Sequence, residues 1–575
     1  MAPTRQKHPR GLMPLFFTEM WERFGYYLML GIFTLYMIAP ITGEFPGLGM
    51  SNREAADIYG TYLALVYLTP FFGGLLADRY MGYRLAVLLG GLLMALGYMG
   101  LAIPGHGAPF YISLLLIILG NGLFKPNISV LLGRLYEKPE YSALKDSGYN
   151  IFYMGINIGA FVCNFVAAWL RLTYGWGWAF VAAGLGMLVG LVIFFVSVRR
   201  IPELREADRI SPPASGDVSL LRILFVLFLP AFALAAAGWF IPGNIFGSDS
   251  TDAFLFFCLP VLLFFFNTWR TASEQERPPI AALLTIFGVV VIFWAVFHQN
   301  GSALTYWAQN NTDRDLNPAM ASVFNTIAGT EEVSTVPRTL KITGLHGDEQ
   351  GVTVGPNPYF SNYSRTLPAG NIVGRPEDVP EGEWMQVSSG DLSGYGRLQL
   401  WPTELQASIN PFFVVLLTPL VVAFFRFLQR RGKEPSTPGK IAWGMLVSAA
   451  SALVMVVAAL LCNNGAEKAS VGWLFGVYGV ITAGELCLSP MGLSLVSKLA
   501  PRRIAAFMMG GWFLSTSIGN KLSGILSGMW DVFEKKANFF LTNAVLTAGA
   551  FLIILMLLPW LNRVYKEYME KTGNL

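Results

Sequence analysis

The sequence predicts an all-α integral membrane protein with fourteen transmembrane helices, and two observations lead to this fold class. The first is composition: the 575 residues are 54% hydrophobic and 13% charged, whereas soluble domains carry about 25% charged residues. The second is that the hydrophobic residues come in blocks of about 20 to 25, the length that crosses about 30 Å of hydrocarbon. An ordinary soluble protein is therefore excluded.

The first block follows a short basic N-terminus, MAPTRQKHPRGLMPL, and no small-residue cleavage site comes after it. We therefore expect a retained first span and not a removed signal peptide. The expected spans, with boundaries good to a few residues, lie near 12–40, 54–77, 83–103, 109–133, 146–170, 176–198, 218–241, 252–269, 280–309, 405–428, 438–462, 470–499, 503–528 and 538–562.

The grouping of these spans is six, two and six, which predicts two six-helix bundles with an inserted helix pair. Two related bundles around a central site are the plan of a large class of transporters. The expected division is a cytoplasmic N-terminus (1–11), an N-terminal bundle (12–198), a linker with the inserted pair (199–279), the first helix of the C-terminal bundle (280–309), an external insertion (310–404), the other five helices (405–562) and a cytoplasmic tail (563–575).

Lysine and arginine predict the orientation, because cytoplasmic segments retain positive charge. With the N-terminus inside, the inner segments hold most of the basic residues, and the short outer loops hold few. The inner set is Arg5, Lys7, Arg10, Arg79, Arg84, Arg134, Lys138, Lys145, Arg199, Arg200, Arg205, Arg209, Arg270, Arg277, Arg426, Arg430, Arg431, Lys433, Lys440, Lys498, Arg502 and Arg503. The even number of spans returns the C-terminus to the same side.

The insertion at 310–404 is polar and rich in glycine, proline and acidic residues, with short β-like runs such as RTLKITGL and GVTVG. A connection of this length is usually functional or disordered. Two interpretations stay open at this point: a small β-rich external subdomain, or a partly disordered segment without a role in the mechanism.

The four cysteines, Cys163, Cys258, Cys462 and Cys487, have neither disulfide-like nor metal-ligand spacing. We expect buried, small apolar side chains and no metal site.

The stretch TEMWERFGYY places three charges at the start of the first span. On a helix, Glu22 lies about 60° to one side of Glu19 and Arg23 about 40° to the other. A charge at the bilayer centre costs at least about 2.5 to 3.5 kcal/mol. The three charges are therefore expected to face a polar interior; the alternative is a cluster that reaches the headgroups from the inner end of the span.

Other polar residues lie in both halves of the chain. Lys125 precedes Pro126 in LGNGLFKPNIS, and Glu485 lies in ITAGELCLSPMG. The N-terminal half thus supplies two cations, Arg23 and Lys125, and the C-terminal half an acid. This set predicts a water-filled cavity for a ligand with an anionic and a cationic end, such as an amino acid or short peptide. Lys521 in SIGNKLSG has no assigned role; it pairs with a nearby acid or reaches towards the headgroups.

Several motifs also carry a family resemblance. GGLLADRYMGYR resembles the loop between spans two and three of the major facilitator superfamily. EMWERFGYY, GLFKPNIS, FYMGINIGA and GELCLSPMGL are jointly similar to the motifs of the proton-dependent oligopeptide transporter family within it. The inserted helix pair resembles that of prokaryotic members. The insertion at 310–404 has no counterpart in the family pattern.

The resemblance implies a binding role for a set of residues on both bundles. The peptide carboxylate would meet Arg23, Lys125 and Tyr27, and the ammonium would meet Asn157, Asn410 and Glu485. Side-chain pockets would be lined by Tyr67, Trp294, Trp512 and Thr516, for which plain helix packing is the alternative. Glu19 and Glu22, coupled to Arg23 and Lys125, would carry the proton.

Two residues depart from the family pattern. Leu30 replaces an arginine, and His298 in FWAVFHQNG replaces an acid; in the family these two form an ion pair at the outer gate. Their joint loss leaves no unpaired charge. His298 either titrates near neutral pH as a proton site or is a neutral, hydrogen-bonded histidine, and both interpretations stay open.

By this resemblance we expect a proton-coupled symporter for di- and tripeptides, with no cofactor and no nucleic-acid partner, functional as a monomer in the plasma membrane of a prokaryote. The alternative cargo is nitrate or an organic anion, against which Glu485 argues. A membrane enzyme is disfavoured because no nucleophile elbow, H-E-x-x-H spacing or cofactor loop is found. A sensor is disfavoured because no cytoplasmic output domain is found.

Overall fold

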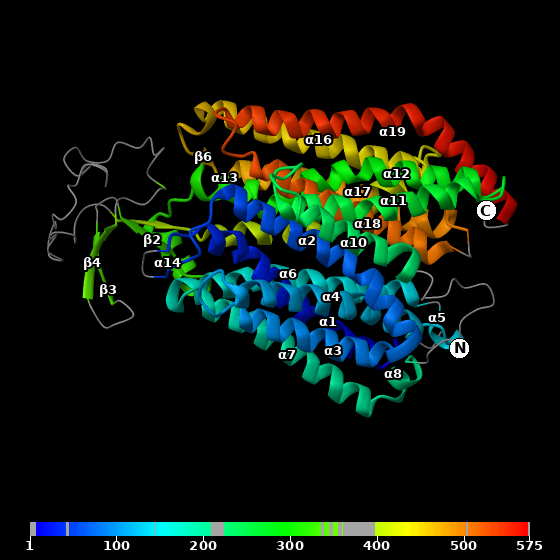
Figure 1. The fold of residues 1–575 in the computed structure, drawn as a ribbon, viewed down its shortest axis with the longest axis horizontal. Coiled ribbons are helices and arrows are strands. Elements are labelled where there is room, and N and C mark those ends of the chain that lie inside the picture. Colours follow the sequence, from blue (N-terminus) through cyan, green and yellow to red (C-terminus); the bar gives the residue numbers. More distant parts are fainter. Residues whose placement is uncertain are drawn as a thin grey trace.

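The computed structural model describes residues 7–41, 45–142, 144–208, 224–334, 338–343, 349–354, 359, 397–501 and 504–572. Long helices run roughly parallel to one another in two groups, and both termini lie at one end of the molecule (Figure 1). The described strands of the polar insertion lie at the opposite end. We call these the terminal end and the insertion end.

The N-terminal bundle consists of six long helices. They are α1 (Leu12–Ile38), α2 (Asn52–Leu76), α3 (Tyr83–Gly100), α4 (Ala108–Leu135), α6 (Lys145–Tyr174) and α7 (Trp176–Arg200), with the short α5 (Pro139–Ser142) and a π-helical turn η1 (Ala77–Met81) between them. α1 packs between α6 and α7, and α3 packs against α4. A single apolar cluster joins all six helices.

The loop GGLLADRYMGYR fixes the terminal end of this bundle. The Tyr83 hydroxyl donates to Asp78 Oδ1 at 2.5 Å and accepts from Arg134 Nη2 at 2.9 Å. Gly82 has a φ of 75°, which favours glycine. Arg84 Nε donates to Asp208 Oδ2 at 2.6 Å and so ties the linker to the bundle.

The linker begins with α8 (Pro202–Glu206), and the inserted pair is η2 (Leu224–Phe228) with α10 (Leu229–Trp239), followed by α11 (Asp249–Arg270). The start of the expected span at 218–241 falls in 209–223, outside the described residues. Ser248 caps α11 by accepting from the backbone N–H of Thr251.

The C-terminal bundle contains α12 (Arg277–Phe297), α15 (Ile409–Arg430), α16 (Thr437–Leu461), α17 (Gly472–Leu499), α18 (Ala505–Gly528) and α19 (Lys536–Thr572). Short elements connect them: η3 (His298–Gly301), α13 (Ala303–Asn310), η6 (Thr403–Ser408) and η7 (Asn463–Gly465).

Two of the expected boundaries differ in the structure. The span expected at 280–309 is broken at η3, where Asn300 and Gly301 are weak helix formers and a Cβ at Gly301 would lie 1.8 Å from the Tyr59 hydroxyl. The last helix runs on to Thr572, past the expected end at 562, because RVYKEYMEKT contains no glycine or proline.

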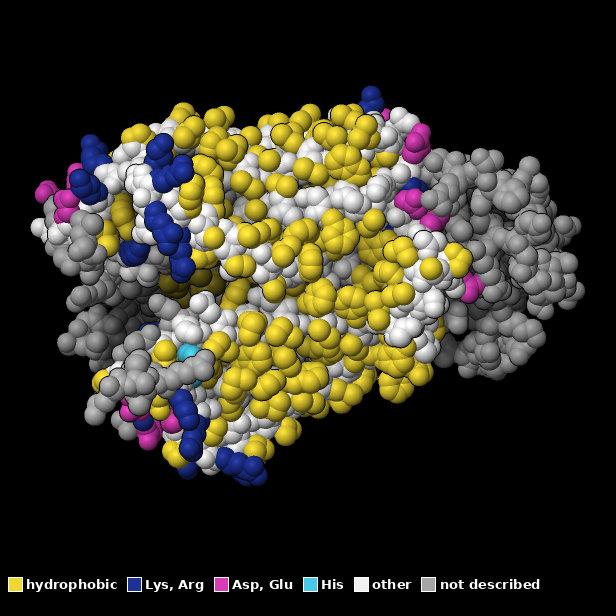
Figure 2. All heavy atoms as spheres, turned by 180° about the vertical axis from the view of Figure 1, so that it is seen from behind, with side chains coloured by type: hydrophobic (Ala, Val, Ile, Leu, Met, Phe, Trp, Pro, Cys, Tyr) yellow, Lys and Arg dark blue, Asp and Glu magenta, His cyan; other side chains and the backbone are white. Residues whose placement is uncertain are grey.

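Among the described residues, eleven helices are long and apolar enough to cross a membrane. α1 and α18 are not among the eleven, because polar residues on their inward faces lower their mean hydropathy. In α18 these buried polar residues are Ser515, Thr516, Ser517, Asn520, Lys521, Ser523 and Ser527. Apolar side chains cover the middle of the molecule, and lysine and arginine gather at the terminal end (Figure 2). This is the surface that a membrane-spanning bundle requires.

The described part of the insertion contains strands, as the RTLKITGL and GVTVG runs predict. β3 (Arg338–Thr343) pairs with β4 (Glu349–Val354), and β2 (Glu331–Ser334) with β5 (Arg397–Leu400), both antiparallel. β1 (Thr312–Asp313) pairs with β6 (Ala469–Ser470), and α14 (Pro318–Ile327) lies between β1 and β2 in the chain. Residues 360–396 lie outside the described part.

Candidate functional site

A cavity lies between the two bundles, with about 1440 Å³ of atom-free space including its mouth. Both bundles line it, with α1, α2, α4 and α6 on one side and α12, α15, α17 and α18 on the other. Eleven of the predicted site residues line it: Glu19, Arg23, Tyr27, Tyr67, Lys125, Trp294, His298, Asn410, Glu485, Trp512 and Thr516.

The three charges of α1 form one buried cluster. Arg23 Nε lies 3.1 Å from Glu19 Oε1 and also contacts Glu22 Oε2. The side chains of Glu19 and Arg23 are 4% exposed and that of Glu22 is 0% exposed. This burial favours the predicted interior position over a cluster that reaches the headgroups. Glu22 does not line the cavity; it lies behind Arg23.

A second cation, Lys125, faces the same cavity from α4. Its Nζ lies 4.5 Å from the centre of the Tyr67 ring on α2, which is a cation–π geometry. Pro126 follows it inside the helix, where proline removes one backbone hydrogen bond. Arg23 and Lys125 thus present two positive groups on the N-terminal bundle.

The C-terminal bundle presents the acid. The Asn410 amide on α15 donates to Glu485 Oε2 on α17 at 3.3 Å and to Thr482 Oγ1 at 2.8 Å. Trp512 of α18 is 2% exposed and packs over Gly492, where a Cβ would lie 1.8 Å from the indole. Glycine at that position is therefore what admits the ring.

His298 lies at the break between α12 and η3 and is 8% exposed. Its ring lies among Trp294, Phe297 and Tyr67, with centroid distances of 5.3, 5.2 and 5.7 Å. Leu30, the other departure from the family pattern, lines the same cavity.

Asn157 does not line the cavity in this conformation. Its amide donates to the carbonyl of Tyr153, one turn earlier on α6, at 2.9 Å. Tyr153 and Ile156 face the cavity instead. Its predicted role stays a prediction.

Sequence reasoning missed several polar residues of the lining: Tyr26, Tyr59, Ser129, Tyr153, Asn300, Tyr478 and Ser489. Tyr26 and Tyr153 lie inside the motifs EMWERFGYY and FYMGINIGA and could have been included from them. Ser129 and Ser489 lie inside GLFKPNIS and GELCLSPMGL, and Asn300 lies in the stretch FWAVFHQNG, whereas Tyr59 and Tyr478 lie in no recognised motif.

The insertion end of the cavity is closed by hydrogen bonds between the bundles. Thr34 donates to the carbonyl of Gly301 at 2.6 Å and Asn164 to Ser408 Oγ at 2.9 Å. The surface is hollowed between the bundles at the terminal end (Figure 2). The structure therefore has the site accessible from the terminal end.

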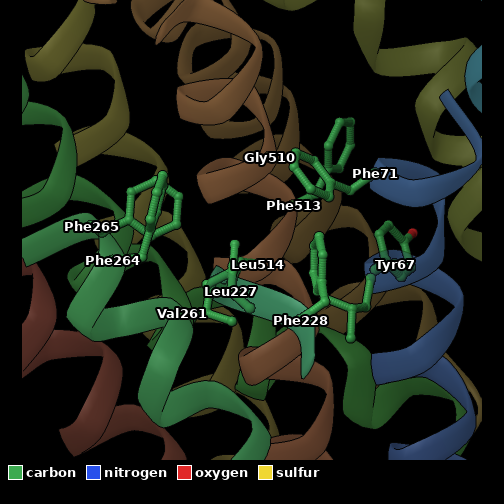
Figure 3. A pocket seen from close by; sticks show the side chains of 11 residues that line it. Tyr67, Phe71, Leu227, Phe228, Val261, Phe264, Phe265, Gly510, Phe513 and Leu514 are labelled. Carbon is green, nitrogen blue, oxygen red and sulfur yellow. The ribbon is translucent and has the colours of Figure 1, made fainter. Parts of the chain in front are cut away.

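A second pocket lies beside the first, between α2, η2, α11 and α18 (Figure 3). Phenylalanine, leucine and valine side chains form most of its wall, and Tyr67 contributes a hydroxyl. None of the described residues that line it is charged, so the polar ligand site is the central cavity.

All four cysteines are buried and unbridged. In the described part of the chain, no cluster of three histidine, cysteine, aspartate or glutamate residues has a geometry for a metal ion.

Comparisons with known proteins place these features in context. A family model described as the POT family matches residues 84–328 and 391–545. The chain is 28% identical to the di-/tripeptide transporter of Lactococcus lactis subsp. cremoris, over 95% of each chain. It is 30% identical to the peptide transporter YePEPT of Yersinia enterocolitica, over 91% of this chain and 88% of that protein.

Solved structures show the same similarity over both bundles. A mutant of the peptide transporter POT, in complex with alafosfalin, superimposes with a TM-score of 0.72, 28% identity and 98% coverage of each chain. A POT family transporter in complex with 5-aminolevulinic acid superimposes with a TM-score of 0.72 and 25% identity, over 96% of this chain and 97% of that one. The family match leaves out residues 329–390, which belong to the insertion.

Proposed function

The chain belongs to the POT family, and on that basis we propose that it is a proton-coupled symporter that imports di- and tripeptides by alternating access. One observation carries the proposal most strongly: Arg23 and Lys125 face the cavity from one bundle, and Glu485 faces it from the other. A zwitterion complements that arrangement of charges, whereas a simple anion leaves Glu485 without a cation to pair with.

In this proposal the peptide carboxylate binds Arg23, Lys125 and the Tyr27 hydroxyl. The ammonium binds Glu485 and Asn410, and Asn157 joins them when its side chain turns from Tyr153. The peptide side chains lie against Tyr67, Trp294, Trp512 and Thr516. Charge-assisted hydrogen bonds of this kind are roughly twice as strong as neutral ones, so both peptide termini contribute to specificity.

Proton coupling follows from the competition for Arg23. With Glu19 and Glu22 both ionised, two carboxylates hold the guanidinium. When the cavity faces outward, protonation of one carboxylate weakens that hold, and Arg23 pairs with the peptide carboxylate. After the inner side opens and the peptide leaves, the acid ionises again and recaptures Arg23.

One proton supplies enough free energy for concentrative uptake. A charge moving down 100 mV releases about 2.3 kcal/mol, which corresponds to roughly fifty-fold accumulation of a net-neutral peptide. The proton is the only coupling agent in this scheme, and no cofactor takes part.

The test is Glu22→Gln in purified protein reconstituted into liposomes. Glutamine keeps the size of the side chain but cannot exchange a proton, so accumulation of dialanine under a pH gradient should be abolished while counterflow exchange persists. A Glu22→Gln protein that still accumulates dialanine would refute the assignment. Adding tripeptides or nitrate as competitors in the same assay separates peptide transport from anion transport.

The proposed setting is the plasma membrane of a prokaryote, in agreement with the bacterial origin of the relatives. We place the terminal end, which carries most of the lysine and arginine, in the cytoplasm. One chain contains both halves of the cavity, so the proposed functional unit is the monomer.

A further inference from the structure

Two ion pairs join the N-terminal bundle to the C-terminal bundle at the insertion end. Asp57 of α2 contacts Lys521 of α18, with Nζ 2.6 Å from Oδ1. Arg171 of α6 contacts Glu404 of η6 in a bidentate arrangement, with Nε–Oε1 at 2.6 Å and Nη2–Oε2 at 3.0 Å. The two pairs lie on different interfaces, α2 with α18 and α6 with η6.

The surroundings of Lys521 are built for its charge. An ammonium has three N–H donors, and here they meet Asp57, Thr61 Oγ1 at 2.7 Å and Ser250 Oγ at 2.8 Å. The side chain of Lys521 is only 2% exposed. An unpaired charge is very unfavourable in such a buried site. The ion pair of Lys521 with Asp57 therefore stabilises the contact between α18 and α2.

The inserted helix pair takes part in the same contact. Ser250 and Ser248, at the start of α11, donate to the two oxygens of Asp57 at 2.6 and 3.0 Å. Farther towards the terminal end, Phe228 of η2 packs on Phe72 of α2 with ring centroids 4.1 Å apart. The inserted helix pair therefore contacts α2 near both ends of that helix. Near Asp57 it also bonds to Lys521 and so contacts both bundles.

The second ion pair is also enclosed by the protein. The Glu404 side chain is 0% exposed and that of Arg171 is 12% exposed. The guanidinium also lies 5.0 Å from the centre of the Trp176 ring. A bidentate pair fixes the relative orientation of its two elements as well as their distance.

At the centre of this end, the family's ion pair is absent, since Leu30 and His298 occupy its positions. The contact between α1 and η3 is instead the neutral hydrogen bond from Thr34 to Gly301. We propose that Asp57–Lys521 and Arg171–Glu404 together form the latch of the insertion end, which stabilises the state closed there and separates when the cavity opens there. None of the four residues lines the central cavity, so all four are positioning residues. The inference rests on alternating access and is independent of the cargo.

The test measures the separation of the two bundles at the insertion end. Spin labels at His106→Cys, in the loop after α3, and Glu534→Cys, in the loop before α19, report that separation by pulsed electron paramagnetic resonance in lipid nanodiscs. Both positions are exposed, and the native cysteines are buried. No substrate is added, so a failure of the peptide assignment does not affect the reading.

Asp57→Asn and Glu404→Gln should each raise the ratio of open to closed distances roughly tenfold or more, the factor expected for a charged hydrogen bond. The double variant should raise it further. The matched control is Lys440→Met, which breaks the Lys440–Glu434 pair within the C-terminal bundle and should leave the distances unchanged. An unchanged distribution in both single variants, or an equal shift in the control, would overturn the latch.

Ser250→Ala covers the case in which a charge variant does not fold. It removes the hydrogen bonds of Ser250 to Lys521 and Asp57, keeps that of Ser248 to Asp57 and leaves the two charges paired, so a smaller shift in the same direction is expected. The charge swap Asp57→Lys with Lys521→Asp should return the distances to those of the parent; if it leaves the bundles apart, the ion pair is not the latch.

Discussion

His298 lies flat against Trp294, with ring centroids 5.3 Å apart and an interplanar angle of 24°. Tyr67 lies between His298 and Lys125. The Lys125 ammonium lies over the Tyr67 ring, and the His298 ring packs against the same ring. Among the described residues, none forms a hydrogen bond to His298 Nε2. A stacked ring with no described carboxylate beside it and with a lysine nearby favours a neutral imidazole over the proton site, but the hydrogen bond expected of the neutral histidine is not found at Nε2.

We therefore predict that His298→Gln keeps proton-driven accumulation of dialanine in liposomes. Its apparent KM should change only a few-fold, because the substitution alters the cavity wall and leaves the charges of the site unchanged. A loss of accumulation with intact counterflow, as expected for Glu22→Gln, would instead identify His298 as part of the proton path.

Glu485→Gln tests recognition of the ammonium. Removing the charge should weaken uptake of peptides with a free amino terminus by roughly 10- to 100-fold in kcat/KM, since a hydrogen bond to a charged group is worth about 1.5 to 3 kcal/mol. Discrimination against N-acetylated peptides should fall by the same factor, because they lack the ammonium in both proteins.

Ser489→Ala is the control for this experiment. Ser489 lies one turn farther along α17 and lines the same cavity without a charge. The Ser489→Ala variant should discriminate against N-acetylated peptides as strongly as the parent does. Equal discrimination by the parent and Glu485→Gln would show that the ammonium binds elsewhere.

Gly60→Ala tests the close approach of the two bundles. A Cβ at Gly60 would lie 2.7 Å from Gly524 Cα. Because the clashing atom belongs to the backbone, α2 and α18 must move apart to accommodate the alanine. Overpacking of this kind costs about 1 to 3 kcal/mol, so the thermal unfolding temperature in a fixed detergent should fall by several degrees.

Gly288→Ala is the matched substitution for Gly60→Ala. Gly288 lies inside α12, and a Cβ there would meet nothing within 4 Å. Alanine favours a helix over glycine by roughly 0.5 to 1 kcal/mol, so this variant should unfold at an equal or higher temperature. If both variants lose stability equally, the packing argument at Gly60 is wrong.

The sequence predicted the helical fold and most of the cavity lining for physical reasons that act locally. Apolar blocks of spanning length identify the helices, and a charge inside such a block must face the interior. Glu19, Arg23, Lys125 and Glu485 are charged residues of this kind. These four residues share one cavity because the inward-facing side chains of each bundle lie on the face that packs against the other bundle.

Contacts between segments far apart in the chain could not be predicted from the sequence. Lys521 had no assigned partner because Asp57 is 464 positions away. Its neighbours in the chain, Asn520 and Leu522, do not reveal that Ser250 of the inserted pair lies beside it. The burial of Glu22 behind Arg23 likewise depends on how α1 packs against α6 and α7, which helical periodicity alone does not fix.

The last prediction concerns stability and pH at the insertion end. Lys468 lies in the loop between α16 and α17, donates to the carbonyl of Asn310 and has its Nζ 4.2 Å from the centre of the Tyr359 ring. Burial, and then the positive charge of Arg314, lower the pKa of Lys468 from its usual 10.5 to about 7. Between these two values the unfolded chain binds more protons at this residue than the folded protein, so stability rises with pH across that window.

Lys468→Met removes this dependence and keeps the apolar part of the side chain. Relative to the parent, the thermal unfolding temperature of the variant should therefore be higher at pH 7 than at pH 9.5, since the lost hydrogen bond to Asn310 weakens the variant similarly at both values. The control is Lys138→Met: Glu206 raises the pKa of Lys138, so that lysine is charged in both states over this range and its removal should produce no pH-dependent difference. A Lys468→Met protein whose difference from the parent is constant between pH 7 and pH 9.5 would show that Lys468 keeps its proton in the folded protein throughout, and with it that the loop is more hydrated than its packing against Tyr359 indicates.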